Sequence, residues 1–388
     1  MNINKCFKYR IYPTKKQVQK LEWTLDKCRI LYNSCLLDRR NHYEQTGKGL
    51  SRIDQQVILK NDKDRFEFLK DIHSQVLQDV LVRVDRAFQN FFRRVKTGEK
   101  PGYPRFKGEG RYDSITYPQE SAFQITPQGL KLSKIGTIKI KLHRAIQGKI
   151  KTCIIKREID RWYACFSVEY EPVKKPIPEK SIGIDVGIKF FATLSDGSVI
   201  DNPKYLIQSE KKLKNKQRCL SRKKKGSANR KKARKIVAKL HCKIRNQRSD
   251  FHHKVSRSII DNYGFIAVED LNIKGMVRNH YLAKSIYDAG WRQFLNYLTY
   301  KAEEAGCRVE KVAPHHTSII CSRCGNSVPK TLANRIHRCP FCNVILDRDH
   351  NAAINILLKS TAGIAESNAW GEVVHQCPSK NQEALSNL

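Results

Sequence analysis

The 388-residue sequence has no run of about 18 apolar residues, the length that a membrane-spanning helix needs. Its first residues, Met1-Asn-Ile-Asn-Lys-Cys6, also lack the apolar core of a secretory signal peptide. We therefore expect an intracellular, cytoplasmic protein without a membrane partner.

Acidic residues are scarce relative to basic ones. The sequence has 37 Asp and Glu against 74 Lys and Arg, which gives a formal net charge of +37. An excess of this size predicts a polyanionic partner, and nucleic acid is the natural one for a protein without membrane segments. We expect association with the nucleoid through that nucleic acid. At 40% hydrophobic residues, the chain can bury the cores of two or three domains.

The cysteines do not suggest a disulfide framework, because their number is odd, thirteen, and nine of them are scattered. The other four form two Cys-x-x-Cys pairs separated by 14 residues. Paired knuckles of this kind bring four thiolates together as a tetrahedral structural zinc requires. A redox Cys-x-x-Cys motif and a chance pair are the alternatives. The predicted zinc ligands are Cys321, Cys324, Cys339 and Cys342.

The first half of the chain changes from a strand to helices and back to strands. Residues 5–12 alternate like a strand, and Thr14 to Gln17 form a capping box that starts a helix. Apolar residues then recur at helical spacing, so residues 14–97 read as a helical module. Residues 98–175 alternate with period two and predict an antiparallel barrel or sandwich, which the strand within residues 1–13 completes.

The second half, after the proline-rich linker that begins at Pro172, contains apolar strands that end in acids. Asp185 follows one strand, Glu269 ends another, and Asp349 opens a helix. Strand, hairpin, helices, strand, a helix over 285–305, a further strand and a final helix follow in the order of a ribonuclease-H-like fold. Three carboxylates so placed can meet at one end of a mixed sheet and hold Mg²⁺ or Mn²⁺. A turn acid for Asp185 and a helix N-cap for Asp349 are the simpler alternatives.

We assign the nuclease-like domain to residues 180–313 and 344–358, with a zinc ribbon over 314–343 and a disordered tail over 359–388. Residues 209–257 form a basic insert with 20 Lys and Arg and two acids, divided into two helical arms at Gly226. An apolar stripe of Ile236, Val237, Leu240 and Ile244 on the second arm argues against a localisation tail.

Two groups of basic side chains are candidate phosphate contacts, with a merely solvated helix face as the alternative. Two glutamines, which can pair with adenine edges, are candidate base readers unless they simply face water. The candidates are Arg83, Arg86, Arg93, Arg94, Lys223, Lys224, Lys225, Arg230, Lys231, Lys232, Gln75 and Gln78.

Several motifs together resemble one family. They are Gly183-Ile-Asp-Val-Gly187, Val268-Glu-Asp-Leu-Asn272, the paired cysteines, Asp347-Arg-Asp-His-Asn-Ala-Ala353, Tyr9-Arg-Ile-Tyr-Pro-Thr14 and Pro101-Gly-Tyr-Pro-Arg-Phe-Lys107. In this order, over roughly residues 1–358, the chain resembles TnpB, the transposon-encoded RNA-guided nuclease related to type V CRISPR effectors.

The resemblance implies a multidomain α+β fold, with a helical module and a wedge-like β-barrel before a RuvC-like nuclease domain that contains the zinc ribbon. It implies a catalytic triad of Asp185, Glu269 and Asp349, with Asp270 and Asp347 as mere neighbours. The implied partners are a guide RNA from the transposon end and a double-stranded DNA target beside a short flanking motif. It also implies that cleavage leaves a 5′-phosphate.

Our mechanistic hypothesis is metal-dependent phosphodiester hydrolysis, with Asp185 between two metal ions and the other two acids on either side. Arg348 or Arg323 could steady charge on the phosphate, or could be surface contacts. Two other functions stay open: a nuclease-inactive RNA-guided DNA-binding repressor, and an RNA-independent resolvase or transposase. The oligomeric state is not predicted.

Overall fold

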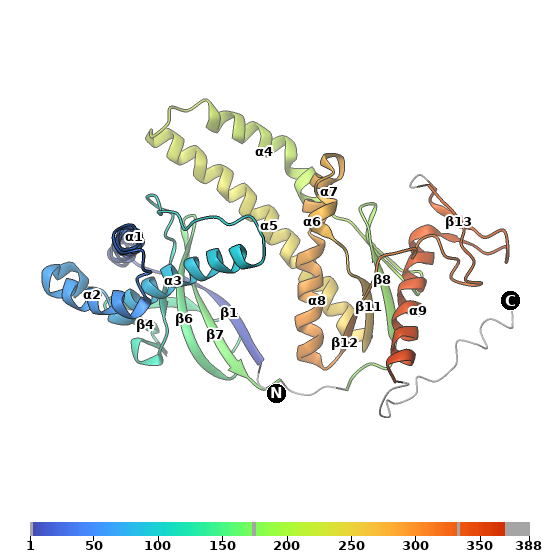
Figure 1. Cartoon of the computed structure of the whole chain (residues 1–388), viewed down its shortest axis with the longest axis horizontal. Helices are drawn as coiled ribbons and strands as arrows, with labels where there is room; N and C mark the ends of the chain where they lie inside the picture. The colour runs from blue at the N-terminus through green and yellow to red at the C-terminus, as the bar shows by residue number, and fades with distance from the viewer. Residues whose placement is uncertain (1–2, 173–175, 332–333, 369–388) are drawn as a thin grey trace. The chain divides into compact units, whose positions relative to one another are not determined.

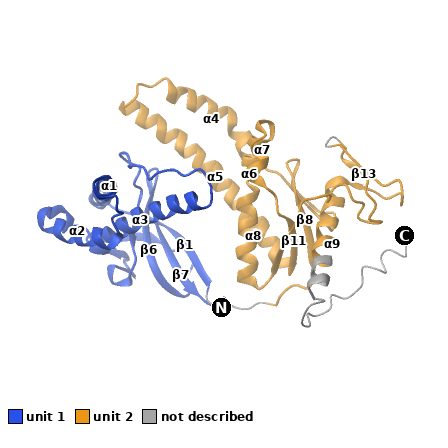
Figure 2. Ribbon diagram, in the orientation of Figure 1, with its two compact units in different colours: residues 1–172 blue, residues 173–388 orange. Residues whose placement is uncertain are grey.

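The computed structural model describes residues 3–172, 176–331 and 334–368, with the backbone alone for 362–368. The chain divides into two compact units, residues 1–172 and residues 173–388 (Figure 2). The division falls at the start of the proline-rich segment predicted to link domains. None of the helices in the described ranges is long and apolar enough to cross a membrane.

The first unit is built on a seven-stranded, near-barrel antiparallel sheet. Its strands are β1 (Ile3–Tyr12), β2 (Ser114–Tyr117), β3 (Phe123–Thr126), β4 (Gly129–Leu132), β5 (Gly136–Lys141), β6 (Lys149–Glu158) and β7 (Arg161–Tyr170). They lie in the order β2-β6-β7-β1-β5-β4-β3. Strand β1 pairs with both β5 and β7, which confirms that the N-terminal strand completes this sheet. The alternating residues Phe7, Tyr9 and Ile11 point into the core, as period two requires.

Three helices belong to this unit: the first and the third contact β2 of the sheet, and the second packs on the third (Figure 1). They are α1 (Lys15–Thr46), α2 (Arg52–Arg65) and α3 (Ser74–Lys96), with short 3₁₀ turns at Glu67–Leu69 and Glu120–Ala122. The predicted capping box is present, because Thr14 Oγ1 accepts from Gln17 N at 3.3 Å and Gln17 Oε1 from Thr14 N at 2.9 Å. On α3 the apolar stripe is buried as far as Val84, whereas Val95 is exposed, so the last turns of this helix leave the core.

The second unit contains a five-stranded mixed sheet. Its strands are β8 (Ser181–Val186), β9 (Phe190–Leu194), β10 (Val199–Asp201), β11 (Phe265–Glu269) and β12 (Arg308–Val312), in the order β10-β9-β8-β11-β12. The hairpin strands are antiparallel, and β8, β11 and β12 are parallel to one another. This arrangement confirms the ribonuclease-H-like order of elements. The central strands β8 and β11 are mainly apolar before Asp185 and Glu269, because helices cover both faces of the sheet.

The helices of this unit are α4 (Tyr205–Ser221), α5 (Ala228–Asn262), α6 (Ile273–Met276), α7 (His280–Ala289), α8 (Trp291–Ala305) and α9 (Arg348–Asn368). Helices α5 and α8 pack together on one face of the sheet, and α9 covers the other (Figure 1). The single helix predicted over 285–305 is wrong, because Gly290, at φ 67°, ends α7 and starts α8.

Helix α9 continues to Asn368, so the predicted boundary at residue 358 between helix and disordered tail is also wrong. The rest of the predicted tail, residues 369–388, lies outside the described residues. Between β12 and α9 the chain forms the small antiparallel pair β13 (Ile336–Arg338) and β14 (Ile345–Asp347).

Candidate functional site

The three predicted catalytic acids lie on three elements that contact one another. Asp185 is the next-to-last residue of β8, Glu269 is the last residue of β11, and Asp349 is in the first turn of α9. Strands β8 and β11 are parallel neighbours in which Ile184 pairs with Val268, so the two acids that follow leave the sheet side by side. Helix α9 packs across both strands.

Gly183 determines how closely α9 approaches the sheet. A Cβ atom on this residue would lie 2.1 Å from the carbonyl oxygen of Ala353 and 2.9 Å from the backbone nitrogen of Leu357. Any larger side chain would push the helix away from β8. The glycine of the Gly-Ile-Asp motif therefore lets the helix that carries Asp349 rest directly on the strand that carries Asp185.

The charges of the acids affect one another. Burial raises the pKa of Asp185 well above its usual range, and the nearby carboxylates of Glu269 and Asp349 raise it further. Burial also raises the pKa of Glu269, while a hydrogen bond from Thr317 and the charge of Lys359 act in the opposite direction. A cation placed among these groups would relieve their repulsion and favour the charged forms.

The acids are neighbours without forming a tight cluster. Among the described residues, one group of three or more Cys, His, Asp or Glu has all its ligand atoms within 4.8 Å of one another, and it consists of the four predicted zinc ligands. The oxygens of Asp185, Glu269 and Asp349 are therefore more widely spaced than the sulfurs.

Asp349 is held by arginines and is not the N-cap of its helix. Its Oδ1 accepts from Arg348 Nε at 3.1 Å, and its Oδ2 lies 3.6 Å from Arg335 Nη1. The backbone nitrogen of Asp349 donates to Asp347 Oδ1 at 2.8 Å, so Asp347 satisfies the first turn. The N-cap alternative for Asp349 is therefore wrong. Arg323, the other arginine considered for the phosphate, is exposed on the ribbon.

Several polar residues around the acids are not among the site residues predicted from the sequence. Thr317 donates to Glu269, and Asn351 and Asn355 of α9 hold the chain that leads into the ribbon. Lys359, near Glu269, lies one residue beyond the predicted end of the domain. No local signal marks Thr317 or Lys359, because each is defined by a neighbour distant in the sequence, whereas the i, i+4 spacing of Asn351 and Asn355 puts both on one face of α9.

The four cysteines form a preorganised site. Cys321 Sγ lies 3.6 Å from Cys342 Sγ, and Cys324 Sγ lies 3.5 Å from Cys339 Sγ. Zinc–sulfur bonds of about 2.3 Å in a tetrahedron place sulfurs about 3.8 Å apart, so the donors fit this metal. Each knuckle closes through a left-handed residue, Gly325 at φ 75° and Asn343 at φ 58°.

Of the candidate contacts in the first unit, Arg83 has a structural role. Its guanidinium bonds Asp79 at 2.7 Å and Thr116 Oγ1 at 2.9 Å, and it lies over the ring of Tyr112. It ties α3 to β2, so we withdraw it from the phosphate contacts. The remaining arginines, Arg86, Arg93 and Arg94, are exposed.

The two candidate base readers differ in their surroundings. Gln75 Nε2 donates to Gln119 within the protein, whereas Gln78 is exposed. Among the described residues, Gln75 therefore has a partner within the protein, and Gln78 is the glutamine that remains open to contact a base.

The basic insert is the helical hairpin of α4 and α5, which confirms the two arms. Lys223, Lys224, Lys225, Lys231 and Lys232 are exposed. Arg230 is not, because its Nη1 donates to the carbonyls of Leu220 at 3.1 Å and Lys223 at 2.8 Å and so fixes the turn. In the predicted stripe Val237 and Ile244 are buried, whereas Ile236 is 48% exposed.

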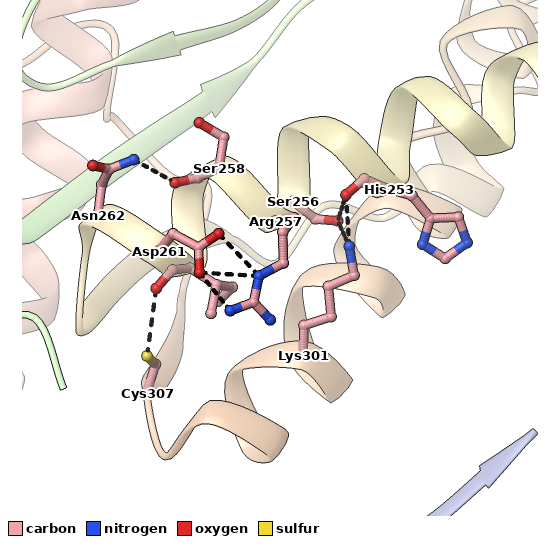
Figure 3. A network of polar contacts seen from close by, with 9 residues as sticks. His253, Ser256, Arg257, Ser258, Asp261, Asn262, Lys301 and Cys307 are labelled. Atoms are coloured by element: carbon pink, nitrogen blue, oxygen red, sulfur yellow. Dashed lines mark hydrogen bonds and ion pairs between the residues drawn. The ribbon is translucent and has the colours of Figure 1, made fainter. Parts of the chain in front are cut away.

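Polar contacts anchor the base of this hairpin to α8 (Figure 3). Buried Lys301 donates to the carbonyl of His253 at 2.6 Å and to Ser256 Oγ at 2.8 Å. A buried ammonium needs such partners. The long helix α5 is therefore fixed at the nuclease-like sheet, while its basic arm extends away from it.

Three family models match separate parts of the chain. A helix-turn-helix domain model matches residues 1–48, where the structure has β1 and α1. A model described as a probable transposase, OrfB of IS605 type, matches residues 165–280. A Cas12f1-like TNB domain model matches residues 291–356, which include the four cysteines.

Two curated relatives span nearly the whole chain, and both carry the name "Putative RNA-guided DNA endonuclease". The protein of Streptomyces pristinaespiralis is 33% identical over 374 residues, 94% of this chain and 90% of its own length. InsQ of Escherichia coli K12 is 30% identical over 398 residues, 97% of this chain and 96% of its own length.

Among solved structures, the Cas12f1 chain in a complex with sgRNA and target DNA matches with a TM-score of 0.56. The match covers 92% of this chain and 98% of that one at 15% identity, and so supports the fold. With whole-length relatives at 30% identity or more and the motifs in the expected order, the chain belongs to the TnpB family of transposon-associated proteins.

Proposed function

We propose that this protein is an RNA-guided DNA endonuclease of a transposable element. It cuts double-stranded DNA next to a short flanking motif by metal-dependent phosphodiester hydrolysis. Relatives named as RNA-guided DNA endonucleases match it over more than nine-tenths of its length. The observation that carries the chemistry is the convergence of Asp185, Glu269 and Asp349 from β8, β11 and α9.

The donor set fits a hard divalent cation. Carboxylate oxygens are the ligands that Mg²⁺ and Mn²⁺ prefer, and burial together with the nearby carboxylates raises the pKa of Asp185, an effect that such a cation would offset. Asp185, Glu269 and Asp349 would hold it. When bound, Mg²⁺ or Mn²⁺ supplies Lewis acidity and lowers the pKa of water for attack on phosphorus.

The protein's own groups orient the acids and balance their charge. Arg348, which contacts Asp349, places positive charge at the edge of the site where a phosphate would enter. Thr317 and Lys359 stabilise the charged form of Glu269. In the ribbon, the four thiolates would hold a structural zinc ion and so stabilise the first knuckle, whose Ser322 nitrogen donates to Asn351 of α9.

The partners follow from the charge and from the family. A guide RNA would supply sequence selection by base pairing with the target strand, while the protein contacts backbone and shape. The exposed lysines of the hairpin and the exposed arginines at the end of α3 are the surfaces we assign to phosphate contact.

The decisive experiment is to express the protein with the DNA that flanks its gene, purify it and sequence the copurified RNA. A single discrete RNA whose end matches sequence outside the element supports guided targeting. That RNA then programs a Mg²⁺-dependent cleavage assay, with the Asp185→Ala protein as the inactive control.

Heterogeneous RNA, or none, would contradict guided targeting. The probable-transposase description of the matching family model makes RNA-independent cutting the second candidate. Cleavage of bare DNA by the wild-type protein after ribonuclease treatment, and not by the Asp185→Ala protein, would support that candidate.

A further inference from the structure

The loop between β12 and the ribbon contains one residue whose hydroxyl group reaches the nuclease-like site. Thr317 is 4% exposed, and its Oγ1 donates to Glu269 Oε1 at 2.6 Å. A hydroxyl of a buried threonine needs a partner, and here the partner is a carboxylate oxygen of Glu269. This hydrogen bond restricts rotation of the Glu269 carboxylate.

The backbone of Thr317 is itself fixed by the helix that carries Asp349. Asn355 Nδ2 donates to the carbonyl oxygens of Thr317 and Ile320, each at 2.7 Å. Asn355 is 4% exposed, so these bonds are shielded from water. The position of Thr317 therefore depends on α9 and not on its own loop alone.

One turn earlier on the same face of α9, Asn351 extends these contacts to the first cysteine knuckle. Its Nδ2 donates to the carbonyl of Ile320 at 2.8 Å, and its Oδ1 accepts from the backbone nitrogen of Ser322 at 2.9 Å. Ser322 lies between the two cysteines of that knuckle. A continuous set of hydrogen bonds thus joins the ribbon, α9 and Glu269.

We propose that Thr317 is a positioning residue for Glu269, which orients this carboxylate toward the divalent cation and couples its orientation to the ribbon and to α9. The inference rests on the proposed function of the three acids. Removal of a partner that orients a metal ligand in this way commonly lowers metal affinity or activity by roughly 10–100-fold.

The test compares Thr317→Val, which removes the hydroxyl group, with Thr317→Ser, which keeps it. Thr299→Val is the matched control, because the Thr299 hydroxyl donates to the carbonyl of Leu295 within α8. The full-length protein, loaded with zinc and freed of RNA by ribonuclease, is titrated with Mn²⁺ while the free ion is followed by electron paramagnetic resonance. The binding that Asp185→Asn abolishes defines the site.

Thr317→Val should weaken this Mn²⁺ binding by roughly 10–100-fold, and Thr317→Ser should retain it to within about threefold. In the cleavage assay, the Mg²⁺ concentration for half-maximal rate should rise for Thr317→Val and not for Thr317→Ser or the Thr299→Val control. Zinc content and thermal midpoint show whether each variant is folded.

Wild-type affinity in folded Thr317→Val would overturn the proposal. Equal losses of Mn²⁺ affinity in Thr317→Ser and Thr317→Val would also overturn it, because they would assign the effect to packing and not to the hydroxyl group. Failure of the wild-type protein to cleave guided DNA would contradict the proposed function instead, while the Mn²⁺ titration would still decide the role of Thr317. An Asp185→Asn protein that binds Mn²⁺ like wild type would overturn both.

Discussion

The cysteine site and the carboxylate site both belong to the second unit, yet they are assembled in different ways. The cysteines come from two knuckles within 22 residues, and their sulfurs already lie within 4.8 Å of one another. The acids come from positions 185, 269 and 349, and only the sheet and α9 bring them together.

The difference follows from loop length and from charge. Two local knuckles close at small entropic cost, so their four sulfurs can come together before a metal binds. Burial first, and then the neighbouring carboxylates, raise the pKa of Asp185, so holding the charged acids together costs free energy that a bound cation would offset. The first site should therefore support the fold, and the second should cost stability in return for function.

The largest expected effect is on cleavage. Asp185→Ala should lower the rate of guided DNA cleavage by roughly 10³-fold or more, because loss of a metal site removes several kcal/mol of transition-state stabilisation. Zinc content and RNA binding should not change. Single-turnover cleavage of a labelled target measures the rate, elemental analysis measures zinc, and copurified RNA measures RNA binding. Retained cutting would show that the acids are not the catalytic site.

Disruption of the cysteine site should instead affect folding. Cys339→Ser should lose zinc and unfold the ribbon, because structural zinc contributes its binding energy to folding. Hydrogen exchange should increase in β13, β14 and the first turn of α9, with no change in the first unit. Cleavage should fall as well, since Asp349 begins α9. A variant without zinc but with full protection would contradict this prediction.

A third prediction concerns the basic hairpin, which touches neither site. Replacement of Lys223, Lys224 and Lys225 by Gln should weaken RNA binding and reduce the slope of log K against log salt by about 2 if all three contact phosphate, at about 0.7 per contact. Affinity measured between low and physiological salt tests this. Arg83→Gln should differ, with lower thermal stability and an unchanged slope, because Arg83 is paired with Asp79.

The smallest expected effect is on stability. The pKa of Asp185 is raised in the folded protein, so the unfolded chain loses this proton first as pH rises, and stability is lost between the ordinary and the raised pKa. In magnesium-free buffer Asp185→Asn should therefore melt higher than wild type above that window, by about 2–4 °C for each kcal/mol. The difference should vanish below the ordinary pKa. Calorimetry that shows a lower melting temperature at pH 8 would contradict the prediction.

Local patterns predicted the elements well where a local rule governs them. The capping box at Thr14, the alternation of β1 and the two arms of the hairpin are all present. Predictions failed where the deciding group is distant or subtle. Helicity over 285–305 hid the left-handed Gly290, and an arginine off the apolar stripe, Arg83, proved to be bound to β2.

The sequence by itself determined the net charge, the cysteine knuckles, the apolar strands with their terminal acids and the family, because each is written in neighbouring residues. Only the tertiary structure decided that Gly183 lets α9 rest on β8 and that Thr317 contacts Glu269. The physical reason is that hydrogen bonds and charge repulsion act over a few ångströms. Which residues come within that range is settled by packing and not by spacing along the chain.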